Sequence, residues 1–222
     1  MAELDMKGDW NERARENARY YIATSVPDDL EAFIESGKRD VGHVFDKIEH
    51  LLHENQTVLD IGCGVGRMDE HVAPRVAHLT GIDVSGEMVK RATERLAHLD
   101  NVKFVECSGR TLAPLEDASF GLVFSHIVFQ HTPRDVTRGY FDEVVRVLKP
   151  GGHFLFQMPG ADSHTPGDPP QADSFEMRYW TEEDLRSELG GRGFEVQEVR
   201  RFAAGDENFQ FEQLRILAHK PE

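Results

Sequence analysis

The stretch Val58-Leu59-Asp60-Ile61-Gly62-Cys63-Gly64-Val65-Gly66-Arg67-Met68 decides the fold. A short apolar run ends in an acid, glycines then alternate with other residues, and a helix-compatible segment follows. This order predicts a strand, a tight turn and a helix start. Glycine lets the backbone turn sharply and approach a ligand closely, and N–H groups at a helix start can face that ligand. Glycine turns also join strands to helices in many α/β proteins, so the stretch alone leaves ligand binding open.

Length and composition restrict the class of protein. The chain has 222 residues, of which 39% are hydrophobic and 29% charged, which suits one globular domain, perhaps extended, rather than a disordered chain. A formal net charge of −15 disfavours nucleic acid and anionic membranes as partners. The two cysteines, Cys63 and Cys107, form no CxxC motif, which argues against a zinc site or a disulfide framework. With no signal peptide or membrane-spanning run recognisable, we expect a cytoplasmic protein.

The rest of the sequence predicts strands that alternate with helices. The expected strands are 57–61, 76–82, 102–105, 120–125, 153–157, 194–202 and 209–218. The expected helices are 10–22, 28–36, 39–53, 85–98, 133–148 and 181–189. We expect Ser36-Gly37 to end the second helix, Lys149–Gly152 to form a turn, and 159–174 to form a long loop. Alternation through residue 157 predicts a parallel sheet with helices on both faces, and the last two strands suit an antiparallel hairpin at its edge.

In parallel sheets of this kind, ligands bind beyond the carboxyl ends of the strands. Those ends are expected at 60–67, 83, 107–110 and 125–131. A carboxylate at Asp83 could accept two hydrogen bonds from a ribose diol. Its alternative role is to cap the next helix, although Ser85 is available for that. A dinucleotide-binding fingerprint needs a third glycine where Arg67 stands, and no Walker lysine follows the loop.

Four segments in order resemble the motifs of class I S-adenosylmethionine-dependent methyltransferases, in their small-molecule, methyltransferase type 11-like branch. These are 58–66, Gly81-Ile82-Asp83-Val84-Ser85, Phe120–Ser125 and Arg146–Gly152, and the resemblance covers about residues 55–160. It implies an α/β, Rossmann-like three-layer sandwich with a seven-stranded, mostly parallel sheet and an antiparallel C-terminal hairpin. It also implies a methyltransferase domain at 55–222, preceded by an N-terminal helical extension at 1–54 that acts as a lid.

The resemblance implies S-adenosylmethionine as cofactor and S-adenosylhomocysteine as product. The resemblance further implies that the loop glycines lie close to the methionine part of the cofactor and that Asp60 helps hold its amino group. It also implies that Asp83 binds the ribose hydroxyls and that Val84 packs on the adenine. The full set of candidate cofactor-binding residues is Asp60, Gly62, Cys63, Gly64, Gly66, Arg67, Asp83, Val84, Met88, Ser108, Gly109, Ser125, Tyr21 and Arg39. Two positions depart from the family pattern, because Ser108 and Gly121 stand where the family usually has Asp. Arg67 could meet the ligand carboxylate, or it could pair with other groups on its own helix. Arg39 could also reach that carboxylate, or it could stay exposed.

Methyl transfer from a sulfonium requires in-line approach of an O, N, S or C nucleophile, and a base only where that nucleophile must lose a proton. His126 and His131, after the fourth strand, are the candidate bases, since histidine titrates near neutral pH. Each could instead be structural. Cys63 and Cys107 are more easily explained as small residues at crowded positions than as nucleophiles. No histidine pair has metal-ligand spacing, so we expect no metal.

The sequence thus favours a methyltransferase acting on a small molecule, as a monomer or homodimer, without nucleic-acid or membrane partners. Two alternatives remain open. One is a non-catalytic S-adenosylmethionine-binding or regulatory protein. The other is a nucleotide-dependent oxidoreductase, which Arg67 and the Lys149–Gly152 segment disfavour.

Overall fold

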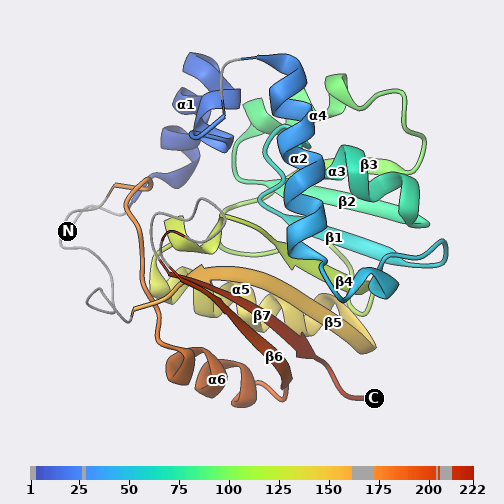
Figure 1. Ribbon diagram of the computed structural model, residues 1–222, viewed down its shortest axis with the longest axis vertical. Coiled ribbons are helices and arrows are strands. Elements are labelled where there is room, and N and C mark those ends of the chain that lie inside the picture. Colours follow the sequence, from blue (N-terminus) through green and yellow to red (C-terminus); the bar gives the residue numbers. More distant parts are fainter. Residues whose placement is uncertain (1–3, 27–28, 162–172, 204, 206–211) are drawn as a thin grey trace. The chain divides into compact units, whose positions relative to one another are not determined.

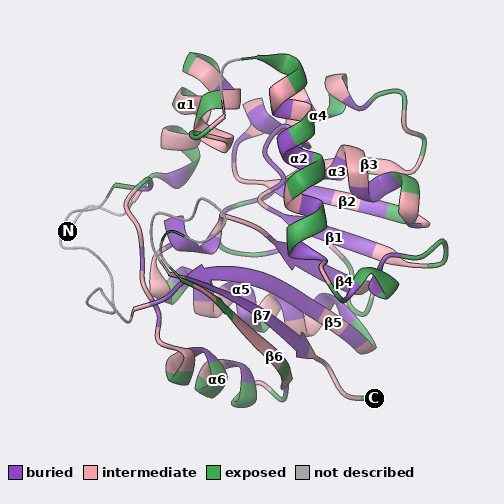
Figure 2. Cartoon of the chain, viewed as in Figure 1, coloured by how far each residue is buried: buried purple, intermediate pink, exposed green. Residues whose placement is uncertain are grey.

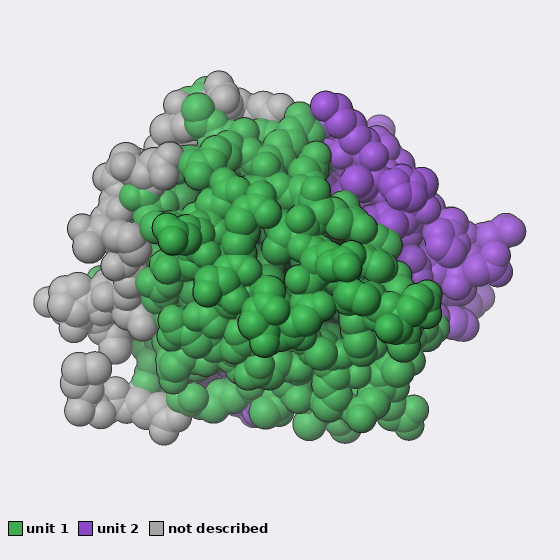
Figure 3. All heavy atoms as spheres, turned by 90° about the horizontal axis from the view of Figure 1, so that it is seen from below, with its two compact units in different colours: residues 1–4, 110–222 green, residues 5–109 purple. Residues whose placement is uncertain are grey.

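The computed structural model describes residues 4–26, 29–161, 173–203, 205 and 212–222. The chain forms two compact units, one of residues 5–109 and one of residues 110–222 with 1–4, which Figure 3 colours separately. The two N-terminal helices therefore belong to the same unit as the first three strands. The division at residues 54 and 55 expected from sequence stays a prediction.

The unit of residues 5–109 contains three parallel strands with helices before and between them (Figure 1). Its elements are α1 (Met6–Ile22), α2 (Leu30–Val44), the 3₁₀ turn η1 (Glu49–Leu51), β1 (Thr57–Ile61), α3 (Asp69–Val72), the 3₁₀ turn η2 (Ala73–Arg75), β2 (His78–Asp83), α4 (Gly86–Arg95) and β3 (Val102–Glu106). β1 pairs with β2 so that Ile61 lies opposite Ile82, and β2 pairs with β3 so that Asp83 lies opposite Glu106. The register brings the carboxyl ends of all three strands to one edge.

The unit of residues 110–222 holds the antiparallel part of the sheet. Its elements are β4 (Phe120–Ser125), the 3₁₀ turn η3 (Phe129–His131), α5 (Arg134–Val147), β5 (Leu148–Pro159), α6 (Glu182–Gly190), β6 (Glu195–Phe202) and β7 (Gln213–His219). β4 and β5 are parallel, whereas β7 runs antiparallel to both β5 and β6. The seven strands have the order β3-β2-β1-β4-β5-β7-β6. Strands 57–61 and 120–125 match their predicted bounds, and the antiparallel pairing of the last two strands is confirmed.

Burial follows the apolar runs of the sequence, and Figure 2 shows the sheet interior as buried. β1 is buried from Val58 to Ile61, as a strand covered on both faces must be. Helix starts use the side-chain caps that the sequence offers. Asp29 accepts from the Ala32 N–H at the start of α2, and Ser85 accepts from the Met88 N–H at the start of α4.

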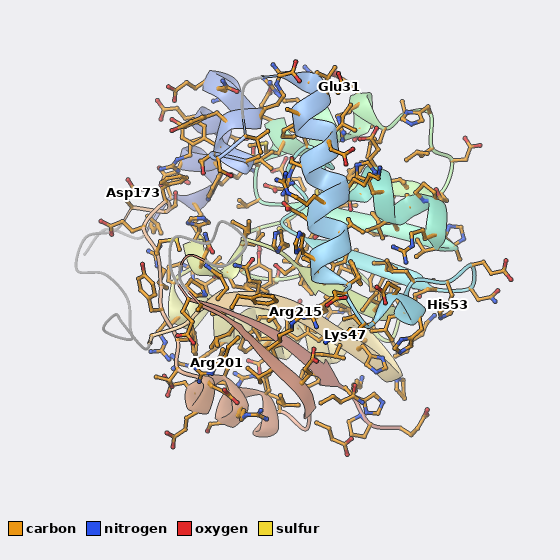
Figure 4. The ribbon with its side chains drawn as sticks, viewed as in Figure 1. Glu31, Lys47, His53, Asp173, Arg201 and Arg215 are labelled. Carbon is orange, nitrogen blue, oxygen red and sulfur yellow. The ribbon has the colours of Figure 1, made fainter. Side chains whose placement is uncertain are left out.

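One sequence prediction about α2 is wrong, because the segments 28–36 and 39–53 do not form two helices. A single helix runs through Gly37 to Val44, and the chain then turns at Lys47, whose φ is 66° (Figure 4 labels Lys47). A Cβ built on Gly37 would clash with the backbone carbonyl oxygen of Arg67. Gly37 is therefore the point at which α2 packs closely on the segment after the glycine loop, rather than a helix stop.

Further differences concern element ends. β5 already begins at Leu148, so the predicted turn at Lys149–Gly152 lies within this strand, with Gly151 at a φ of 74°. The predicted loop 159–174 lies mostly outside the described residues. Among those described, no helix is long and apolar enough to cross a membrane. The same residues contain no cluster of three or more His, Cys, Asp and Glu side chains that could hold a metal ion.

Candidate functional site

The glycine loop between β1 and α3 has a backbone that only glycine adopts easily. Gly62, Gly64 and Gly66 have φ values of 81°, 54° and 74°, in the left-handed region. The N–H groups of Gly62 and Cys63 donate to the carbonyl oxygen of Ile82, at 2.8 and 3.0 Å. The loop therefore turns away from β1 while it stays fixed to the end of β2.

Asp83 joins this loop to the start of α4. One carboxylate oxygen accepts from the Gly64 N–H at 2.9 Å, and the other accepts from the Ser85 N–H at 2.8 Å. Burial raises the pKa of Asp83 to about 6, while these backbone donors act in the opposite direction by favouring the carboxylate. Each oxygen keeps a second lone pair, so Asp83 can still accept bonds from two hydroxyls.

Two arginines hold the loop from its other sides. Arg95 of α4 donates to the carbonyl oxygens of Val65 and Gly66, at 3.3 and 2.8 Å. Arg67 is only 5% exposed and donates to Asp40 of α2 at 2.6 Å and to the Ser36 hydroxyl at 3.2 Å. The structure thus gives Arg67 partners on α2, whereas a contact with a ligand carboxylate stays a prediction.

Helix α1 lies along the carboxyl ends of β1 to β3. The Asn11 side-chain oxygen accepts from the Ser85 hydroxyl at 2.8 Å and from the Glu87 N–H at 3.1 Å, which fixes α1 to the start of α4. Further along, Ala14 and Ala18 pack in a buried cluster with Val65 and Met88.

The two ends of α1 reach the glycine loop and the end of β3. A Cβ built on Gly64 would lie 2.8 Å from Cδ1 of Ile22, so the last residue of α1 rests on the loop. A Cβ built on Gly109 would lie 2.8 Å from Val84 and 3.3 Å from Cε of Met6. These contacts place α1 over the whole candidate site within this unit.

α1 bends where it crosses the site. Asn17 has non-helical angles of φ −161° and ψ 86°, and its side-chain oxygen accepts from the Tyr20 N–H at 3.1 Å. The side chain of Asn17 therefore starts a second helical segment, as an N-cap does. At the opposite end of α1, Lys7 forms an ion pair with Glu106, the last residue of β3.

The remaining predicted cofactor residues of this unit differ in exposure. Val84 is half-buried, Met88 is buried against α1, and Ser108 is exposed. The Tyr21 hydroxyl donates to Glu16 at 2.8 Å, and the half-exposed Arg39 lies 3.9 Å from the Asp40 carboxylate. The roles of Tyr21 and Arg39 in cofactor binding stay predictions.

Both cysteines are buried thiols, at the glycine loop and after β3. Burial, together with the negative charges of Asp69, Asp83 and Asp60, raises the pKa of Cys63 well above its usual range. A thiol that resists ionisation is a poor nucleophile, which favours the packing role expected from sequence.

The histidine candidates belong to the unit of residues 110–222, together with Ser125 at the end of β4. Directly after Ser125 and His126, the β-branched Ile127 has a φ of 58°, a strained conformation of a kind that gathers at functional sites. His131 is 8% exposed, with Nε2 3.0 Å from the side-chain nitrogen of Gln130 and its ring stacked on Phe175 at 5.4 Å. Its imidazole is therefore held in one plane.

Arg178 fastens the segment that carries Phe175 onto His131. It is 2% exposed, and its guanidinium donates to the carbonyl oxygens of Glu176, His131 and Asp173, at 2.6, 3.2 and 3.2 Å (Figure 4 labels Asp173). Its backbone N–H donates to the Gln130 carbonyl at 2.8 Å. This bracing role of Arg178 was not predicted from the sequence.

The sequence analysis missed three contributors to the site in residues 5–109. Asn11 and Met6 contact it only because of the way α1 docks, and Asp69 is completely buried beside the glycine loop. Asp69 stands beside Arg67, Glu70 and His71, so its sequence context is that of an exposed helix start and does not signal its burial. Nothing in the sequence around Met6 distinguishes it from any helical methionine.

Comparison with known proteins bears on residues 59–156, which match the family model described as "Methyltransferase domain". The malonyl-[acyl-carrier protein] O-methyltransferase of Marinomonas sp. (strain MWYL1) is 35% identical over 121 residues, which are 51% of this chain and 42% of that protein. The arsenite methyltransferase of Halobacterium salinarum is 28% identical over 194 residues, which are 83% of this chain and 48% of that protein. The chain thus spans about half the length of these relatives.

Among solved structures, the N-methyltransferase NodS from Bradyrhizobium japonicum WM9, in complex with S-adenosyl-L-homocysteine, superimposes with a TM-score of 0.69 at 17% identity. The match covers 96% of this chain and 100% of that one. The predicted fold is confirmed: a seven-stranded, Rossmann-like mixed sheet whose last strands are antiparallel. The chain has the fold of the class I S-adenosylmethionine-dependent methyltransferases. Within that class, residues 59–156 resemble a methyltransferase domain, and the curated relatives that match this chain are methyltransferases.

Proposed function

We propose that the protein is an S-adenosylmethionine-dependent methyltransferase that moves a methyl group to an O, N, S or C nucleophile of a small molecule. One observation carries the proposal: the Asp83 carboxylate holds the Gly64 N–H of a loop with three left-handed glycines. This arrangement puts a ribose-binding acid and a backbone cradle side by side at two neighbouring strand ends. The relatives and the matched domain support methyl transfer as the reaction.

The residues present fit such a cofactor. The positive φ of the three loop glycines turns the backbone sharply at the end of β1, and a Cβ at Gly64, Gly66 or Gly109 would lie 2.8 Å from a neighbouring side chain, so the loop stays free of side chains at these positions. The two oxygens of Asp83 suit a pair of ribose hydroxyls. We assign the methionine part to Gly62, Gly64 and Gly66, with Asp60 near its amino group, and the adenine to Val84 and Gly109.

When bound, the cofactor supplies an activated methyl group on a sulfonium. The protein supplies position and dryness, which are the main needs of an in-line displacement. Asp83 orients the ribose, and Arg95 keeps the glycine loop rigid through its carbonyl oxygens. Helix α1 excludes water from this face, because Met6, Asn11 and Ile22 contact the site along its length.

A prediction follows for the lid role of α1. Asn11→Ala removes two hydrogen bonds that fix α1 to the start of α4, so we expect affinity for S-adenosylhomocysteine to fall by about 1 kcal/mol, or roughly fivefold. Isothermal titration calorimetry measures this change. The exposed neighbour provides the control, since Glu12→Ala alters the same helix without touching α4. Equal affinities in the two variants would argue that α1 is only an edge helix.

A second prediction concerns His131. If His131 takes the proton of the acceptor, His131→Ala lowers turnover by about a hundredfold, within the range typical of general bases. Affinity for S-adenosylhomocysteine changes little. His126→Ala, three residues before the start of η3, separates the two candidates in the same assay. Turnover of His131→Ala that equals wild type across the pH range would return His131 to a packing role.

The finer assignments are part of this proposal. We propose a cytoplasmic protein that acts as a monomer or homodimer on a small molecule, and a net charge of −15 argues against nucleic acid as substrate. Titration with S-adenosylmethionine, S-adenosylhomocysteine and NAD tests the choice of ligand. We expect micromolar or tighter binding of the first two and none of NAD. Tight binding of NAD without binding of either sulfur ligand would favour an oxidoreductase instead.

A further inference from the structure

Two buried carboxyl groups lie together beside the glycine loop. Asp60, near the end of β1, is 5% exposed, and Asp69, the first residue of α3, is 0% exposed. A Cβ built on Gly66 would lie 3.5 Å from Oδ2 of Asp69, so Asp69 adjoins the loop directly. The two carboxyl groups are close enough to influence each other, since the pKa of each responds to the other. We call these two residues the carboxyl pair.

A hydrogen bond between two carboxyl groups requires a proton on one of them, because ionised carboxylates only accept. Within the described residues, no N–H or O–H group donates to either oxygen of Asp69. A proton shared between the two carboxyl groups would therefore satisfy Asp69. Burial raises the pKa of Asp69 to about 7 and holds the pKa of Asp60 well above its usual range, with the second carboxyl adding to the effect on Asp60.

The two arginines that face the pair form their ion pairs with other carboxylates, and Nε of Arg67 has no hydrogen-bond partner among the described residues. Arg67, in the segment after the loop, is paired with Asp40. Arg95 of α4 is paired with Glu70 and donates to loop carbonyls. Both arginines lower the pKa of the pair electrostatically, Arg67 that of Asp60 and Arg95 that of Asp69.

The other titratable groups nearby add no positive charge. Asp83 faces Asp60 from β2 and raises its pKa further. Cys63, in the loop, is a buried thiol whose own pKa is raised, and Cys107 faces Cys63 from the segment after β3. A second negative charge on the carboxyl pair thus lacks a counter-ion among the described side chains.

We propose that the carboxyl pair carries one shared proton in the ligand-free protein and releases it when the cofactor's amino group binds beside Asp60. The inference rests on the proposed function, in which Asp60 holds that amino group. The ammonium group supplies the counter-charge that the pair lacks, the second carboxyl ionises, and the proton leaves to solvent. Asp69 is a positioning residue in this scheme, because it acts through Asp60 and sets its charge.

Proton release makes binding depend on pH with a definite sign. Because the bound state holds fewer protons than the free state, affinity rises with pH, by up to about tenfold per pH unit for one proton. We expect this slope for S-adenosylhomocysteine below about pH 7, the pKa of Asp69 in the ligand-free protein, and a plateau above it. 5′-Methylthioadenosine lacks the amino-acid part of the cofactor, so its affinity stays flat over the same range.

Calorimetry of the whole protein tests the proposal directly. Titrations with S-adenosylhomocysteine at about pH 6, where the shared proton is still held, in phosphate and in Bis-Tris buffer, report released protons as a difference in apparent enthalpy. We expect wild type to release close to one proton with S-adenosylhomocysteine and close to none with 5′-methylthioadenosine. Release of equal numbers of protons with the two ligands would overturn the proposal, and this comparison needs no variant.

A matched pair of variants assigns the proton. Asp69→Asn keeps a side chain of the same shape, and its amide donates to an ionised Asp60, so we expect binding without proton release and without the pH slope. Asp100→Asn changes an exposed acid of the same compact unit and keeps the release. Full proton release in a folded Asp69→Asn variant contradicts the proposal. If the wild-type protein binds S-adenosylhomocysteine without releasing a proton, this inference alone is overturned. If the wild-type protein does not bind S-adenosylhomocysteine, the proposed function is overturned.

Discussion

Gly64→Val abolishes cofactor binding while the protein stays folded. Gly64 has a φ of 54°, a conformation that a β-branched residue adopts only with strain. A Cβ at this position would also lie 2.8 Å from Cδ1 of Ile22, so the side chain of valine pushes the end of α1 off the loop. Both effects disturb the backbone that we assign to the methionine part. We expect no binding of S-adenosylhomocysteine at concentrations about a hundredfold above the wild-type Kd, a loss of more than about 2.7 kcal/mol.

The same substitution at Gly42 is the control for Gly64→Val. Gly42 is exposed in α2, has an ordinary helical φ, and a Cβ built there meets nothing within 4 Å. Gly42→Val therefore tests valine in the same unit without the strain or the clash. Circular dichroism and thermal unfolding confirm that both variants are folded. A normal titration of Gly64→Val would mean that this loop does not hold the ligand.

Asp83→Ala weakens cofactor binding by about 1–3 kcal/mol, the range for hydrogen bonds to a charged group. Part of this loss is direct, since alanine cannot accept bonds from ribose hydroxyls. The rest is indirect, because the N–H groups of Gly64 and Ser85 lose their acceptor and the loop is no longer tied to α4. Asp83→Asn retains one oxygen acceptor but no charge, and we expect its loss to be intermediate.

Titration calorimetry with S-adenosylhomocysteine measures the effect of Asp83→Ala. Asp100→Ala serves as the control, because Asp100 is an exposed acid in the same compact unit, away from the strand ends that carry the site. It separates loss of a specific acceptor from loss of one negative charge among many. If both variants bind as wild type does, Asp83 is not part of the binding site and its role is to hold the N–H groups of Gly64 and Ser85.

The sequence was most informative where local chemistry alone decides the structure. The apolar run ending at Asp60 could only be a buried strand, and alternate glycines there require positive φ, as the structure shows. Asp83 at the next strand end was predicted as a ligand acceptor from its position. The contact of Asp83 with the Gly64 N–H was not predicted, because it depends on the parallel pairing of β1 with β2.

Other parts of the site depend on how separate elements pack, which a single sequence does not reveal. Gly37 was interpreted as a helix stop, yet it is the close contact between α2 and the backbone of Arg67. Asn11 belongs to a mixed polar helix, and only the docking of α1 brings it to Ser85. Asp69 follows the loop as an ordinary helix-start acid would, and its complete burial is a property of the packed structure.

The measurement that tests the central claim most directly is methyl transfer from S-adenosylmethionine labelled in its methyl group into a small-molecule metabolite extract. We predict that wild-type protein moves label into at least one small molecule, that S-adenosylhomocysteine inhibits this transfer, and that Gly64→Val abolishes it. Wild-type protein that binds S-adenosylhomocysteine but transfers no label into any extract would contradict an enzymatic role and favour a non-catalytic cofactor-binding protein.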